Sequence, residues 1–127
     1  MIAATPVSTP SCLGREDGVK VRIKTTPRAV RVGHRLFFRI ENLGTQAIDF
    51  GVQWSVEQLS KGRWAAAPFS PRGPWTEQLL ELPAGERMLW QRFTIPETAT
   101  PGLYRLRKPI EFANGNRPCL APFRVVG

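Results

Sequence analysis

The sequence is poor in the side chains that most often carry out chemistry. Its 127 residues include one histidine, His34, and two cysteines, Cys12 and Cys119, so soft ligands for a structural zinc site are too few. His34 falls in a predicted turn, without a nearby pattern that supplies the nucleophile and orienting carboxylate needed by a catalytic base. We therefore interpret His34 as a surface turn residue.

Sequence motifs for other kinds of catalysis are missing as well. The acidic residues show no paired spacing that suggests a glycosidase. Neither a glycine-rich phosphate loop nor a dinucleotide fingerprint is present. The sequence therefore predicts a protein that is not an enzyme and that holds no cofactor and no metal ion.

Long hydrophobic runs are also absent. No window contains enough consecutive apolar residues for a membrane-spanning helix. The first eleven residues, MIAATPVSTPS, show neither the basic nor the apolar region of a signal peptide. Their composition is typical of a linker, so we expect residues 1–17 to be an irregular tether and residues 18–127 to form one domain.

Short alternating segments, separated by 12 prolines and 11 glycines, dominate the rest of the chain. Apolar residues at every second position predict β-strands. The segments are residues 19–24, 36–41, 48–59, 63–66, 76–82, 87–95, 104–112 and 120–126. Residues 55–61 could instead form a helical turn, but the alternation favours a strand. Pro109 would demote the second half of its strand to an edge or a bulge, and Pro122 would lie on an unpaired side or in a bulge.

Turn signals and the strand count together predict the fold class. Asn114-Gly115-Asn116 is a strong hairpin turn signal. Seven or eight short strands without a convincing helix predict an all-β protein with the architecture of an antiparallel β-sandwich.

The segment Pro101-Gly102-Leu103-Tyr104 indicates a more specific topology. A tyrosine just inside a strand that is entered in this way is typical of the tyrosine corner of Greek-key, immunoglobulin-like sandwiches. The Tyr104 hydroxyl should then bind a backbone group a few residues upstream. The expected core includes Leu36, Phe38, Ile40, Trp54, Tyr104 and Leu106.

The order of these motifs resembles the bacterial Ig-like domain family of cell-envelope and secreted proteins. The matching motifs are Val32-Gly33, IENLGTQAIDFG, WSVEQLSKGRW, LPAGE and PGLYRL, within residues 19–112. The resemblance implies a non-catalytic binding or spacer module outside the cytoplasm, with a protein or envelope partner. Trp54 is the candidate for the buried tryptophan of strand C. Leu106 occupies the position where the antibody-type pattern has its second cysteine.

A second resemblance is to the intracellular proteinase inhibitors of bacilli, which are also Ig-like sandwiches. It rests on the polar turn that contains Asn42 and on the LPAGE turn. An inhibitor would present a rigid loop to a protease, and the proline-rich segment Phe69–Trp75 is the candidate. Trp64 and Trp75 flank this loop, so they and Phe69 are possible partner contacts.

The two cysteines lie near opposite ends of the chain. In an Ig-like sandwich the first strand often runs beside the last, which would bring Cys12 and Cys119 to one end of the domain. We favour a disulfide in an extracytoplasmic protein over the alternative, two free thiols in a cytoplasmic one.

The net charge of +8 favours association with anionic polymers. Lys20, Arg22 and Lys24 share one face of a predicted strand, and Arg105 and Arg107 share a face of another. A single patch made of both groups would bind an anionic polymer weakly and in a salt-dependent way. No reading helix or stacking platform is visible, so we expect no sequence-specific recognition of nucleic acid.

Overall fold

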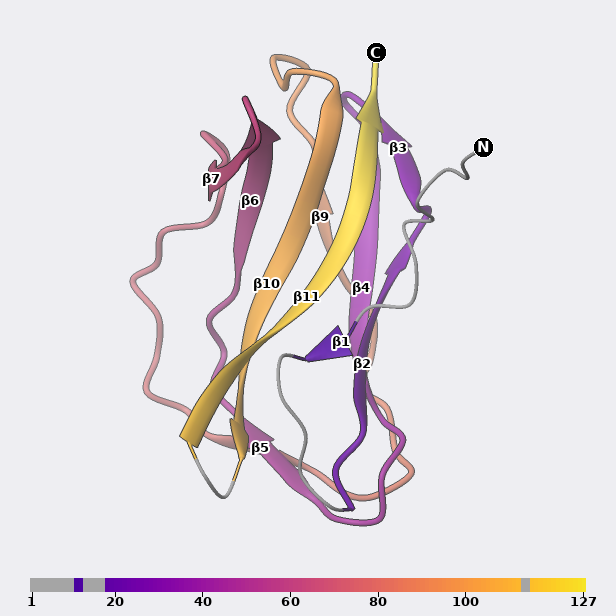
Figure 1. Cartoon of the computed structure of the whole chain (residues 1–127), viewed down its shortest axis with the longest axis vertical. Helices are drawn as coiled ribbons and strands as arrows, with labels where there is room; N and C mark the ends of the chain where they lie inside the picture. The colour runs from indigo at the N-terminus through magenta and orange to yellow at the C-terminus, as the bar shows by residue number, and fades with distance from the viewer. Residues whose placement is uncertain (1–10, 13–17, 113–114) are drawn as a thin grey trace.

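A computed structural model describes residues 11–12, 18–112 and 115–127, which form two facing β-sheets (Figure 1). The smaller sheet has the order β2 (Val21–Thr26), β4 (Arg35–Asn42), β9 (Gln91–Thr94). The larger sheet contains β1 (Ser11–Cys12), β3 (Ala29–Arg31), β5 (Ile48–Phe50), β6 (Ser55–Ser60), β7 (Arg63–Ala66), β8 (Leu80–Leu82), β10 (Gly102–Phe112) and β11 (Gly115–Val126). None of the described residues forms a helix that is long and apolar enough to span a bilayer.

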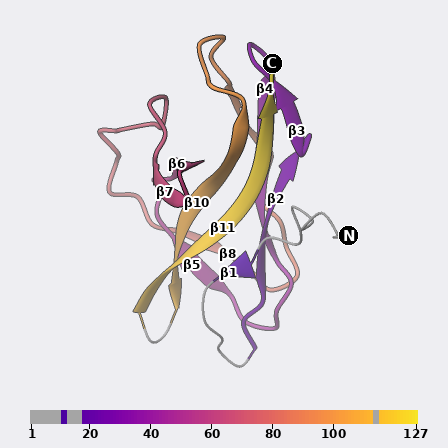
Figure 2. The ribbon, with the colours of Figure 1, turned by 45° about the horizontal axis from the view of Figure 1, so that its top comes forward.

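A long hairpin, β10 and β11, is the centre of the larger sheet and lies in front of β4 and β9 in Figure 1. On its outer side β11 pairs with β1 and, in parallel, with β3. On the other side β10 pairs with β6 and β5, which continue the sheet to β7 and β8. The chain changes sheets between β2 and β3 (Figure 2). The connection contains Pro27 and Arg28. Because β3 then runs parallel to the last strand, the arrangement is that of an Ig-like sandwich.

The core lies between the two sheets and contains the residues that the alternation predicts. Leu36, Phe38 and Ile40 on β4 and Tyr104 and Leu106 on β10 are all at most 1% exposed. These five predictions are confirmed, since period-two alternation places one face of each strand against the facing sheet.

The sixth predicted core residue, Trp54, is only partly buried. It lies in the irregular segment between β5 and β6, with its ring centroid 5.0 Å from Phe38 and 4.8 Å from Phe93. Trp54 therefore packs at the margin of the core, where strand pairing is interrupted.

The tyrosine corner is present. The Tyr104 hydroxyl donates a hydrogen bond to the Thr100 carbonyl oxygen at 2.6 Å, and its ring stacks on Phe123 with centroids 5.8 Å apart. This contact connects the entry to β10 with the core, as the sequence predicts.

The prolines of β10 and β11 do not break the hairpin, so the prediction of an edge or bulge at Pro109 is wrong. Pro122 lies on an unpaired side of β11, between the residues that pair with β1 and those that pair with β3, as predicted. Pro109 lies opposite Pro118, and Arg105 lies opposite Pro122. A pair of prolines cannot exchange amide hydrogen bonds, so Pro109 and Pro118 occupy a non-hydrogen-bonded pair of the ladder. Pro122 lies at an even spacing from Pro118 and has the same orientation. Each missing N–H therefore points away from the partner strand.

Several strand boundaries differ from the prediction. The expected strand at residues 76–82 is reduced to β8, because residues 76–79 are exposed and lie in a long loop. The expected strand at residues 48–59 is divided into β5 and β6, which confirms strand rather than helix for residues 55–60. With β1 and β3 added, the described residues form eleven strands rather than seven or eight.

A β-bulge shortens the strand that was expected at residues 87–95 to β9. Glu41 lies opposite Arg87 and Phe38 opposite Gln91, so four steps along this segment match three along β4. The extra residue disrupts the ladder at Leu89 and Trp90, which are 88% and 40% exposed.

The two ends of the predicted layout fall partly outside the described residues. Within the expected tether, Ser11 and Cys12 form the short strand β1. Residues 1–10 and 13–17 are not among those that the structure describes. The same is true of Asn114 in the expected turn. Gly115 and Asn116 already belong to β11, which therefore begins before the predicted residue 120.

The structure contains the disulfide between Cys12 and Cys119. The two residues are direct neighbours in the antiparallel pairing of β1 with β11, and Cys119 is fully buried. Cys119 lies inside β11 rather than at its start, so the bond attaches β1 to the middle of the sheet and not to one end of the sandwich.

We predict that this bond contributes substantially to stability, because it closes a loop with a sequence separation of 107 residues. Restricting the unfolded chain to that extent corresponds to about 4–5 kcal/mol in the chain-entropy model. Urea unfolding of the oxidised protein and of the double variant Cys12→Ala/Cys119→Ala should differ by up to this free energy. Titration of two thiols in the denatured, unreduced wild type would contradict the prediction.

Candidate functional site

The basic residues singled out in the sequence lie on opposite sheets. Arg22 and Lys24 belong to β2 in the smaller sheet, while Arg105 and Arg107 belong to β10 in the larger sheet. The two groups therefore face away from each other and do not form one patch, although the sequence left that open.

Arg105 also has contacts within the protein. Its Nε donates to Glu57 Oε1 at 2.7 Å, and its guanidinium lies 4.2 Å from the centre of the Trp64 ring. Trp64 lies on β7 and is partly buried, so only part of its side chain is accessible to a partner. Both residues stabilise the edge formed by β6 and β7.

The proline-rich loop after β7 is attached at its start and exposed at its end. The Phe69 ring lies 5.4 Å from the Tyr104 ring, and the backbone N–H of Val56 donates to Ser70 Oγ at 2.9 Å. From residue 72 to residue 79 every side chain is exposed, including Trp75 at 39% and Leu79 at 62%. The loop therefore presents two large apolar side chains on a fixed base.

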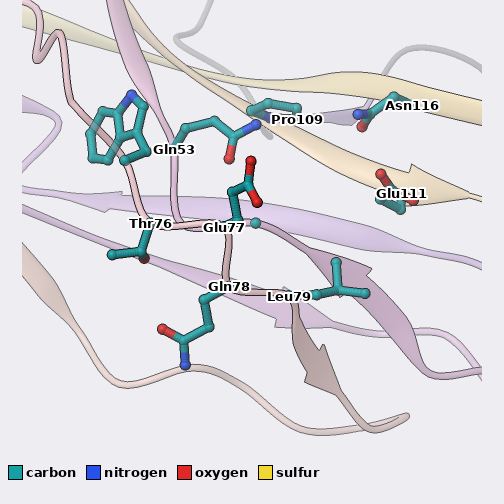
Figure 3. A pocket seen from close by; sticks show the side chains of 10 residues that line it. Gln53, Thr76, Glu77, Gln78, Leu79, Pro109, Glu111 and Asn116 are labelled. Atoms are coloured by element: carbon teal, nitrogen blue, oxygen red, sulfur yellow. The ribbon is translucent and has the colours of Figure 1, made fainter.

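A hollow lies between the end of this loop and the lower part of the hairpin (Figure 3). Its lining includes Trp75, Thr76, Glu77, Gln78 and Leu79 from the loop, and Gly51, Gln53, Pro109, Glu111 and Asn116 from the other side. Figure 3 shows the Glu77 side chain directed toward Gln53. Amide and carboxylate groups next to a tryptophan can bind a polar partner, but this lining contains no histidine, cysteine, serine or lysine.

Lys108 is buried close to this hollow, with 4% of its surface exposed. Its ammonium group donates to the carbonyl oxygens of Gly51 at 2.6 Å and Gln53 at 2.9 Å, and Nζ lies 5.2 Å from the Phe50 ring centre. Burial lowers the pKa of Lys108 to about 8. Lys108 thus holds the irregular segment between β5 and β6. The sequence contained a signal for the burial of Lys108, because Lys108 lies two residues from both Leu106 and Ile110 and therefore falls on the inward face of the strand.

Glu41 is the second buried charge, at 4% exposure. Its carboxylate accepts hydrogen bonds from Arg22 Nε at 2.7 Å and from Arg39 Nε at 2.9 Å. Burial raises the pKa of Glu41, but the hydrogen bonds and positive charges of the two arginines outweigh burial, so the pKa lies below its ordinary value. The Arg39 guanidinium also lies 4.2 Å from the Trp90 ring centre. No pattern in the sequence indicates this cluster, because its members come from three separate segments.

His34 lies in the turn between β3 and β4 and is exposed. Its backbone N–H donates to the Arg31 carbonyl oxygen, and its own carbonyl oxygen accepts from Ile95 N–H. Its position agrees with the surface-turn interpretation. Within the described part of the chain, no three His, Cys, Asp or Glu side chains are grouped so that they could hold a metal ion.

The fold, the tyrosine corner and the inter-sheet core define an immunoglobulin-like β-sandwich domain. Residues 16–119 match the family model described as Bacterial Ig-like domain, and the chain belongs to that family. This confirms the family resemblance, which extends further toward the C-terminus than the expected residue 112 and includes Cys119. No curated protein matches the chain.

Solved structures with a similar fold include parts of larger enzymes. Pseudomonas fluorescens alkylpurine DNA glycosylase AlkC, bound to DNA containing an abasic site analogue, is 20% identical with a TM-score of 0.54, over 90% of this chain and 32% of that chain. A β-glucosidase from Listeria innocua in complex with glucose is 17% identical with a TM-score of 0.41, over 86% and 16%. The PmoD soluble domain from Methylocystis sp. is 13% identical with a TM-score of 0.47, over 91% and 97%.

The chain therefore spans about a third of the length of the glycosylase and about a sixth of that of the glucosidase. At 20% identity the likeness to the glycosylase shows a shared fold and nothing about activity.

We predict that the buried ammonium of Lys108 makes stability depend on pH. Between pH 8 and the ordinary lysine pKa of 10.5, the unfolded chain holds a proton that the folded chain lacks, so the free energy of unfolding rises with pH. Relative to Lys108→Met, wild type should gain about 2 kcal/mol between about pH 7 and pH 9.5.

Denaturant unfolding at a series of pH values measures this difference. Lys24→Met is the matched control, because Lys24 is exposed and its removal should leave the wild-type pH dependence unchanged. Parallel pH profiles for wild type and Lys108→Met would show that burial does not shift this group.

Proposed function

We propose that the chain is a non-catalytic binding module whose protein partner docks on the proline-rich loop and the adjoining hollow. The observation that carries the proposal is the pair of exposed apolar side chains, Trp75 and Leu79, next to polar groups of the hollow. Tryptophan on an anchored loop is a favourable centre for an interface because it buries a large area and loses little conformational freedom.

The composition of the hollow fits the same proposal. In the hollow, the titratable side chains are Glu77 and Glu111, and the one hydroxyl of the lining, that of Thr76, has no histidine or lysine beside it in the lining to act as a base. His34 lies in a turn between β3 and β4, far along the chain from the loop and outside the lining of the hollow. A binding role needs only the shape and the exposed groups that the loop provides.

The compartment that fits this module is outside the cytoplasm. The disulfide between Cys12 and Cys119 is stable in oxidising compartments and is rare where thiols are kept reduced. In the glycosylase of similar fold the matching region is a minor part of a longer chain, which supports a role as an accessory domain.

We predict that partner binding depends on the loop. The double variant Trp75→Ala/Leu79→Ser removes the two apolar anchors, and loss of anchors of this kind typically weakens binding by about tenfold or more. Affinity capture from an envelope fraction, followed by titration of the captured protein, measures the change.

Leu43→Ser is the matched control, because Leu43 is 46% exposed and lies in the turn after β4. A partner that binds wild type and the loop variant equally well would move the binding surface elsewhere. Failure to recover any partner with the wild-type loop would count against the proposal.

A second candidate function is protease inhibition through Phe69–Trp75. The favouring observation is that Phe69 and Ser70 attach the start of the loop to β10 and β6, while Arg72 and Trp75 are exposed beyond them. A loop that is fixed in this way can enter a protease cleft without a large loss of conformational entropy.

The inhibitor function predicts stoichiometric inhibition of a serine protease. Because Arg72 is the exposed basic residue of the loop, a protease that cleaves after arginine should be inhibited, and Arg72→Ala should abolish the effect. Titration of a protease panel with the full chain provides the measurement. Full protease activity at a large molar excess of the chain would exclude this function.

A further inference from the structure

The outward face of the smaller sheet is strongly basic, and most of the residues responsible were not grouped by the sequence. Inward residues alternate with outward ones on β2, β4 and β9, so the outward positions form rows across the three strands. One row contains Lys24 and Arg39, the next contains Phe37 and Arg92, and Arg35 follows beside Thr94.

The charge on this face is one-sided. The outward positions of the three strands, together with Arg87, carry six cations: Arg22, Lys24, Arg35, Arg39, Arg87 and Arg92. The carboxylate among them is Glu41, which is buried between Arg22 and Arg39. Lys24, Arg35, Arg87 and Arg92 are exposed. A flat sheet face with this excess attracts an extended anionic surface.

The β-bulge before β9 adds apolar groups to the same region. Leu89 is 88% exposed, the largest exposure of any large hydrophobic residue in the described chain, and the neighbouring Trp90 is 40% exposed. The Trp90 ring lies over Arg39, which places it on the outward side of β4 among the cations. Met88 instead packs against the core and fixes the start of the bulge.

We propose that this face, defined by Lys24, Arg35, Arg87, Arg92, Leu89 and Trp90, docks on the surface of an anionic lipid bilayer. The cations would lie over the negatively charged headgroups, where each contributes about fivefold to binding. Leu89 would enter the boundary between headgroups and acyl chains, and Trp90 would occupy the headgroup level that tryptophan prefers. The sheet itself would lie flat on the membrane without crossing it.

Exposed Leu89 favours a bilayer over a nucleic acid or another soluble polyanion. Phosphate polymers use cations and, when single-stranded, flat aromatic rings, but they gain nothing from an isolated aliphatic side chain. A bilayer can bind cationic, aromatic and aliphatic side chains at the same time. This face is on the sheet opposite the hairpin and does not include the proline-rich loop, so the inference goes beyond the proposed partner site.

Co-sedimentation of the full chain with vesicles tests the proposal. Wild type should bind vesicles that contain about one-third phosphatidylglycerol in phosphatidylcholine and should not bind pure phosphatidylcholine, with affinity falling as salt rises. Lys24→Glu/Arg92→Glu should weaken binding by at least about 20-fold, and Leu89→Ser by about tenfold.

Two matched controls separate this face from general charge and hydrophobicity. Arg107→Glu/Arg124→Glu makes the same change in charge at exposed positions of the opposite sheet, and Leu43→Ser removes another exposed leucine. Both should bind as wild type does. All variants are at exposed positions, and an unfolding curve for each verifies that the fold is retained.

Three results would overturn the proposal. The first is equal binding to neutral and anionic vesicles, and the second is equal loss of binding in the two charge-reversal variants. The third is tighter binding to a short single-stranded or duplex oligonucleotide than to anionic vesicles, with no effect of Leu89→Ser. That result would show a phosphate-polymer surface in place of a lipid surface.

Discussion

The packing of aromatic rings between the two sheets is the interaction on which the rest of the structure depends. Phe38 and Phe93 from the smaller sheet both contact Trp54. Phe93 also contacts Phe123, which stacks on Tyr104. These contacts help to remove the inward faces of β4, β9, β10 and β11 from water, and burial of apolar surface is the dominant favourable term in folding. Because side chains alternate along a strand, the same contacts also determine which residues are left to face the solvent.

The functional surfaces follow from that constraint. With the inward positions of β2, β4 and β9 occupied by the core, their polar and charged neighbours lie together on the outer face of one sheet. The proline-rich loop leaves the other sheet and has few residues with which to pair, so Trp75 and Leu79 remain exposed. The sandwich thus separates a basic face on one sheet from a loop surface on the other that combines apolar and polar side chains.

Two buried polar residues show how the sandwich tolerates exceptions to the alternation. Lys108 occupies an inward position but reaches the carbonyl oxygens of Gly51 and Gln53 at the interruption between β5 and β6. Asn42 is fully buried at the end of β4, where its side-chain amide donates to the carbonyl oxygens of Gln46 and Leu82. Each supplies hydrogen bonds to backbone that leaves the regular ladder, and this compensates for the burial of a polar group.

The sequence by itself determined the alternating strands, the core positions on β4 and β10, the tyrosine corner and the family, because these depend on local patterns of two to five residues. Tertiary structure decided the bulge at Leu89 and Trp90, the unbroken hairpin through Pro109 and Pro118, and the pairing of Cys12 with the interior of β11. It also decided that the cations of β2 face the same way as Arg35 and Arg92 and away from Arg107. Strand neighbours and register come from contacts between distant segments, and periodicity along one strand carries no information about which strand will lie beside it.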